Sequence, residues 1–127
     1  MKFVASLISI IAAFLLAASA WAGEQPYDKA AFDKAVAEGK PVIVDFFADW
    51  CPTCKAQKPH VQSILGEAKM KDVTLFIADY DKEKDLKRAL RVTQQATFVV
   101  FKAGKEVARS TGQTQREQLA ALLNRAL

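Results

Sequence analysis

The sequence predicts an α/β fold in which helices flank a mixed, four-stranded central sheet. The strongest sign is the near-continuous apolar run VIVDFF at residues 42–47, because such a run is typical of a parallel strand that helices cover on both faces. Helical and strand-like segments alternate after it. The chain has 127 residues, of which 51 % are hydrophobic, which is enough for one core and too few for two ordinary domains.

Residues 1–22 have the pattern of a secretory signal peptide. Lys2 provides a basic start, an apolar run of about 16 residues follows, and an Ala-Trp-Ala cleavage site ends the stretch. The alternative is an uncleaved membrane anchor, but the run is shorter than the ~20 residues that span a bilayer. We expect cleavage after Ala22, with cleavage after Ala20 as the second choice. This leaves one domain at residues 23–127, located in the periplasm if the source is Gram-negative.

The charge balance gives no sign of nucleic-acid binding. Lys and Arg number 18 and Asp and Glu number 14, so the net charge is +4, and removal of the signal peptide would take away only Lys2 and leave +3. The basic residues are spread along the chain, and no basic stripe interleaved with aromatic residues appears. We therefore predict no nucleic-acid partner.

The first helix is predicted over residues 29–38. Asp28 is a good N-cap, the apolar residues after it recur at helical spacing, and a glycine and a proline follow as stop signals. The apolar strand at 42–47 comes next, and the second helix begins at the cysteines and runs to about Met70. Pro59 lies inside that helix and should kink it, because proline removes one backbone hydrogen bond.

Three further strands and two helices complete the predicted order. A strand at 73–78 is joined to the first strand through the second helix, so these two strands should be parallel with a right-handed connection. A short helix around Leu86–Leu90 follows. Strands at 97–102 and 106–110 are separated only by a tight turn, which predicts an antiparallel hairpin. The last helix is predicted at 114–126.

The residues that carry chemistry are Cys51 and Cys54, a Cys-x-x-Cys pair that follows the central strand and opens a helix. Thiol–disulfide exchange needs a thiolate, and the unpaired N–H groups and dipole at a helix start favour negative charge on Cys51. Cys51 is therefore the predicted nucleophile, and Cys54, one turn inside the helix, is the resolving thiol. Pro52 at the first helical position loses no needed donor.

A purely structural disulfide is the alternative for these cysteines. A four-residue loop contributes only about 2 kcal/mol in the chain-entropy treatment, which is less than a long-range bridge would give. The predicted signal peptide would also direct the protein to an oxidising compartment, in which disulfides form and persist. A redox-active disulfide is therefore the favoured interpretation.

The sequence WCPTCK at residues 50–55 is similar to the redox site of the thioredoxin family, and the resemblance covers residues 27–127. Asp45 lies six residues before Cys51, where thioredoxins keep a buried aspartate. The stretch ADWC at residues 48–51 is also similar to the C-terminal thioredoxin-like domain of bacterial membrane-bound disulfide-reduction proteins. Further positions match the family's kinking proline, the aspartate before its third helix and two glycines near its end: Pro59, Asp81, Gly104 and Gly112.

The resemblance implies a thioredoxin-like fold and a thiol:disulfide oxidoreductase that exchanges disulfides with protein partners. It implies a monomer with no cofactor, no bound metal and a membrane-bound electron-transfer partner. Asp45 would carry the proton of Cys54; it could instead be a satisfied core polar group, but a charge inside an apolar strand is costly without a role or a partner. Trp50 could also be a plain surface aromatic. The residues expected to contact substrate are Trp50, Pro52, Thr53, Gln95 and Ala96.

Two positions depart from the family. Ala96 stands where thioredoxins have a cis-proline that faces the cysteines, and a cis bond before a non-proline costs roughly 3–4 kcal/mol. We therefore expect a trans Gln95–Ala96 bond or a reshaped loop, and on the resemblance Ala96→Pro should tighten the trapping of substrates. Ile77 stands where thioredoxin has a lysine near the buried aspartate, so Asp45 lacks that partner.

Two other functions remain open. The same cysteines could carry copper or zinc. A structural zinc site normally has four ligands, and His60 lies about 240° around the helix from Cys54 and so faces away. Metal binding would therefore be linear, through the two cysteines, or between chains. Ala96 keeps this alternative open, since the family's proline is thought to shield the cysteines from metal. A redox-inactive interaction module is the other alternative, and the intact cysteine pair argues against it. Pro52 and Thr53 do not fix the direction of electron flow; we favour a partner on the reductase or isomerase side.

Overall fold

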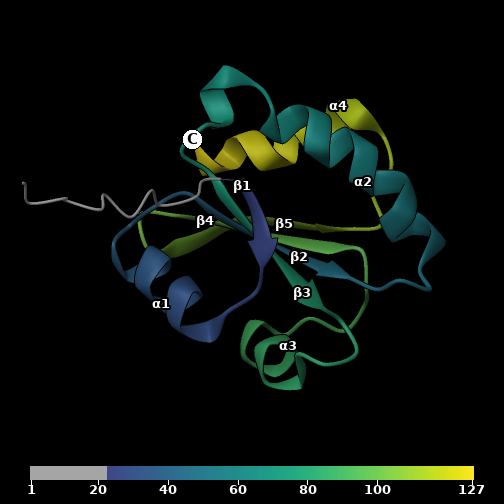
Figure 1. Ribbon diagram of the computed structural model, residues 1–127, viewed down its shortest axis with the longest axis horizontal. Helices are drawn as coiled ribbons and strands as arrows, with labels where there is room; N and C mark the ends of the chain where they lie inside the picture. The colour runs from purple at the N-terminus through teal and green to yellow at the C-terminus, as the bar shows by residue number, and fades with distance from the viewer. Residues whose placement is uncertain (1–22) are drawn as a thin grey trace, which may run out of the picture.

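The computed structural model describes residues 23–127, so the predicted signal peptide and its cleavage site lie outside the described residues. A five-stranded sheet in the order β1-β3-β2-β4-β5 is flanked by helices (Figure 1). The strands are β1 (Gly23–Pro26), β2 (Val42–Phe47), β3 (Thr74–Asp79), β4 (Thr97–Lys102) and β5 (Lys105–Thr111). The helices are α1 (Lys29–Ala37), α2 (Pro52–Leu65), α3 (Lys84–Leu90) and α4 (Arg116–Leu123), with 3₁₀ turns η1 (Ala68–Met70) and η2 (Asn124–Ala126).

The central strand is β2, as its apolar run predicts. It pairs in parallel with β3 and antiparallel with β4, and all of it except Phe47 is buried. β4 and β5 form the predicted antiparallel hairpin. The turn between them has positive φ at both Ala103 and Gly104, which is the backbone that a two-residue type I′ turn requires.

The prediction of a four-stranded sheet was wrong by one strand, β1. This strand has only the four residues GEQP and pairs in parallel with β3 at the edge of the sheet. It carries no apolar alternation, and glycine and proline are depleted in strands. Its backbone pairing with β3 holds it in place, and proline is tolerated at such an edge.

The first helix begins as predicted, whereas the second ends early. The carboxylate of Asp28 accepts a hydrogen bond from the Ala31 N–H at 2.9 Å and so caps α1. α2 ends at Leu65 instead of near Met70, because Gly66 follows as its cap and glycine is a poor helix former. The predicted long helix is therefore a shorter α-helix followed by a 3₁₀ turn.

Helices cover both faces of the sheet (Figure 1). α2 and α4 pack together over one face, and α1 and α3 lie over the other. No helix in the described part of the chain is long and apolar enough to cross a membrane. Each face of the sheet has its own apolar cluster; the first includes Ile43, Ile64, Leu75, Phe98 and Leu119, and the second includes Phe32, Val44, Phe46, Phe76 and Leu86.

Candidate redox-active site

The cysteine pair lies between the end of β2 and the start of α2. Cys51 is the N-cap of α2, and its Sγ accepts a hydrogen bond from the Cys54 backbone N–H at 3.0 Å. The two residues form a disulfide, with Cα atoms 5.2 Å apart, and each is only 1 % exposed. On reduction, this N–H and the helix dipole would stabilise a thiolate on Cys51. The geometry therefore suits an attack by Cys51 followed by resolution by Cys54.

Ala96 packs against the two cysteines, together with Ala48, in a small buried cluster. No peptide bond in the described part of the chain is cis, and Ala96 has a φ of 60°. Its N–H donates to the Phe46 carbonyl at 2.9 Å, and its carbonyl accepts from the Gly112 N–H at 2.9 Å. The expected trans bond between Gln95 and Ala96 is therefore present, and the loop has the reshaped backbone that the sequence suggests.

Asp45 is buried in β2 and has an unusually basic carboxylate. Burial, with a smaller contribution from Glu24 on β1, raises the pKa of its carboxyl to about 7, and Lys58 on α2 acts in the opposite direction. Ile77 is its register partner on β3, so the cation that influences Asp45 comes from a helix instead of that strand position. Among the described residues, Asp45 Oδ1 has no hydrogen-bond partner. Its role as the proton carrier for Cys54 stays a prediction.

Trp50 lies at the surface beside the cysteines and is 56 % exposed. Its indole Nε1 donates a hydrogen bond to Asp81 Oδ2 at 2.7 Å, which joins the loop before α2 to the turn before α3. The ring is therefore exposed, but its orientation is held by the hydrogen bond to Asp81. Of the other residues predicted to contact substrate, Pro52 is exposed, and Thr53 and Gln95 are half-buried.

Sequence reasoning misses Gln57, which is 1 % exposed. Its Nε2 donates to the Gln113 carbonyl at 2.8 Å and to the Ala96 carbonyl at 3.4 Å. A signal for it exists in the sequence, because Cys54, Gln57 and Val61 recur at helical spacing on the buried face of α2. Gln57 is the one amide among the buried residues of that helix.

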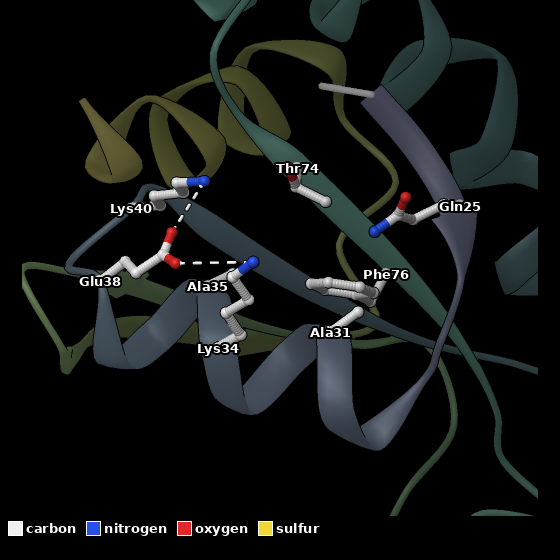
Figure 2. A pocket seen from close by; sticks show the side chains of 8 residues that line it. All are labelled: Gln25, Ala31, Lys34, Ala35, Glu38, Lys40, Thr74 and Phe76. Carbon is white, nitrogen blue, oxygen red and sulfur yellow. Dashed lines mark ion pairs between the residues drawn. The ribbon is translucent and has the colours of Figure 1, made fainter. Parts of the chain in front are cut away.

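Two surface hollows lie away from the cysteines. One hollow, of about 190 Å³, lies between α1 and the edge of the sheet. Figure 2 shows the side chains that line it, among them the ion pair of Lys40 with Glu38. A second hollow, of about 290 Å³, lies between α1 and α3. In the described part of the chain, no group of three or more His, Cys, Asp or Glu residues is placed to hold a metal ion. The alternative in which copper or zinc binds through the two cysteines stays a hypothesis.

A buried disulfide at the start of a helix, next to the central strand of a mixed sheet, defines a redox protein of thioredoxin-like fold. The family model described as Thioredoxin matches residues 24–125, and the chain therefore belongs to the thioredoxin family. It is 35 % identical over 88 residues to a thioredoxin H-type of Fagopyrum esculentum, covering 69 % of this chain and 74 % of that one. It is 33 % identical over 94 residues to a thioredoxin of Chlamydia trachomatis, covering 74 % of this chain and 89 % of that one.

Solved structures agree with this assignment. The structure of Trxlp from Edwardsiella tarda matches with a TM-score of 0.76 and 39 % identity, covering 80 % of this chain and 97 % of that one. Family, fold and cysteine pair together make the protein a thiol–disulfide oxidoreductase. The narrower likeness to membrane-bound disulfide-reduction proteins stays a prediction.

Proposed function

We propose that this oxidoreductase exchanges disulfides with protein partners in the periplasm, and that a membrane-bound partner supplies its electrons. The observation that carries the exchange is the position of Cys51 as the N-cap of α2, with the Cys54 N–H on its sulfur. The predicted signal peptide at residues 1–22 supports the location. The resemblance at residues 48–51 supports the membrane-bound electron donor.

The proposed reaction starts from the reduced pair. The Cys51 thiolate attacks one sulfur of the partner's disulfide, which forms a mixed disulfide and releases the other sulfur as a thiolate that takes up a proton. Cys54 then loses its proton and attacks Cys51 Sγ, which breaks the mixed disulfide and releases the second partner thiol. The partner gains two electrons and two protons, and the Cys51–Cys54 disulfide forms. A dithiol donor returns the pair to the reduced state by the same steps in reverse.

Asp45 is the proposed acceptor for the Cys54 proton. A carboxylate with an ordinary pKa is a weak base at neutral pH, but burial raises the pKa of Asp45 to about 7. A group with a pKa near the working pH can both accept and release a proton. The second step of the reaction would then depend on the protonation state of Asp45.

The reduction potential, measured against glutathione, tests the proposed direction of electron flow. We expect a value closer to about −270 mV, which is typical of thioredoxins, than to about −120 mV, which is typical of a strong periplasmic oxidant. The reason is the similarity of residues 48–51 to the thioredoxin-like domain of disulfide-reduction proteins. A potential near −120 mV would contradict the reductant role. Cys54→Ser, which cannot form the internal disulfide, is the control.

A further inference from the structure

Gln57 joins three segments of the site at one point. It lies one turn after Cys54 in α2, and its side-chain amide donates to the carbonyls of Gln113 and Ala96 at 2.8 and 3.4 Å. The same Ala96 carbonyl also accepts the Gly112 N–H at 2.9 Å. The Gln57 side chain therefore links the helix that carries the resolving cysteine to the Ala96 loop and to the segment after β5.

A side-chain amide at this buried position lowers the stability of the fold when one of its polar atoms is left unpaired. Gln57 Oε1 has no hydrogen-bond partner among the described residues, and an unpaired buried acceptor is destabilising. An apolar side chain of similar length would avoid that cost and would continue the apolar stripe of α2. The benefit of the amide must therefore come from its donors, whose acceptors are both backbone carbonyls close to the cysteine pair.

The residue before Ala96 offers unpaired backbone groups, and Ala96 itself packs against the two cysteines. Ala96 uses its N–H on the Phe46 carbonyl and its C=O on Gly112 and Gln57, so both groups are engaged within the chain. The backbone N–H and C=O of the neighbouring Gln95 make no hydrogen bond within the described residues. Because Ala96 is fixed on both sides, the direction of the adjoining Gln95 carbonyl is fixed as well.

We propose that Gln57 is a positioning residue for the exchange reaction. By holding the Ala96 and Gln113 carbonyls, it keeps Gln95 in place as a docking edge for an extended segment of the partner protein. This inference rests on the proposed exchange with protein disulfides. A small disulfide can reach Cys51 without docking along that edge, so its reduction does not depend on Gln57.

The test compares a protein disulfide with a small one in matched variants. Rates are measured with insulin and with hydroxyethyl disulfide, with dithiothreitol as the reductant in both assays. Gln57→Met keeps the length and loses both donors, and it should lower kcat/KM for insulin by about 3- to 10-fold, the factor that one or two hydrogen bonds are worth. The loss should appear mainly as a higher KM, with the hydroxyethyl disulfide rate and the reduction potential unchanged. Gln118→Met removes an exposed amide from α4 and should leave both substrates unaffected.

An equal loss with both substrates, or no loss with insulin, would overturn the positioning role. Gln57→Leu decides the question if Gln57→Met does not fold, because a leucine side chain also lacks donors and should show the same selective loss. If the parent protein reduced hydroxyethyl disulfide but not insulin, the proposed exchange with proteins would itself fail, whatever the variants do. The two failures are therefore distinguishable.

Discussion

Asp45→Asn is expected to raise the free energy of unfolding at pH 9 by about 3 kcal/mol. Asp45 is only 8 % exposed, and burial raises the pKa of its carboxyl from 3.8 to about 7. A difference of roughly three pKa units corresponds to about 4 kcal/mol, and a poorly paired asparagine amide would cost about 1 kcal/mol. Removing the charge therefore stabilises the fold at high pH, although it removes the proposed proton acceptor.

The pH dependence of this effect has a definite sign. Because the pKa of Asp45 is higher in the folded chain than in the unfolded one, folding binds the proton more tightly. The resulting stabilisation is complete below pH 3.8 and is lost as the pH rises through about 7. Urea unfolding from pH 4 to pH 9 should show the parent losing stability relative to Asp45→Asn across this window. A constant difference between the two proteins at every pH would contradict the explanation.

Glu24 and Lys58 supply controls for the same titration. Glu24 raises the pKa of Asp45 and Lys58 lowers it. Glu24→Gln should therefore move the pH window of the parent protein downward, and Lys58→Met should move it upward. Shifts in the same direction for both variants would show that the titrating group is not Asp45.

Ala96→Pro is expected to destabilise the fold by about 2–4 kcal/mol. Proline holds φ near −65°, whereas Ala96 has a φ of 60°. Proline also has no N–H to donate to the Phe46 carbonyl, which the Ala96 N–H contacts at 2.9 Å. The structure therefore argues against the expectation, drawn from the family resemblance, that proline at this position would tighten the trapping of substrates.

Ala96→Gly is the matched control for the loop. Glycine adopts positive φ without a steric penalty and keeps the N–H, but it loses a buried methyl group, so the stability should stay within about 1 kcal/mol of the parent. Urea unfolding followed by circular dichroism measures both variants. An Ala96→Pro protein that unfolds at the same urea concentration as the parent would show that the hydrogen bond to Phe46 does not hold this loop.

Apolar periodicity explains which parts of the fold could be predicted. The central strand at 42–47 and the strand at 97–102 have the same bounds in the prediction and in the structure. Both are buried, and a buried strand is recognisable in the sequence as a nearly continuous run of apolar residues. β1 has no apolar run, because the residues GEQP are held in the sheet by backbone pairing with β3. That pairing cannot be predicted from the four residues themselves. The end of α2 at Leu65 is marked in the sequence only by Gly66. Because apolar residues at helical spacing precede this glycine, the sequence suggests a longer helix.

The candidate site also has features that the sequence predicts and features that only the folded structure shows. The cysteine pair is apparent because the motif and the helix start lie next to each other in the sequence. Glu24 and Lys58 are remote from Asp45 in the sequence and act on it only through β1 and α2 of the folded chain. The acceptors of Gln57 lie in loops after α3 and β5, so the sequence can mark this amide as unusual but cannot show what it holds.

Insulin reduction by dithiothreitol tests the central claim, that Cys51 is the nucleophile of a thiol–disulfide oxidoreductase, most directly. The parent protein should accelerate the reaction, and Cys51→Ser should remove the acceleration, because a serine hydroxyl is a poor nucleophile without an activating base. Cys54→Ser should still attack and should accumulate a mixed disulfide with insulin that is visible on a non-reducing gel. Equal acceleration by the parent and by Cys51→Ser would contradict the claim.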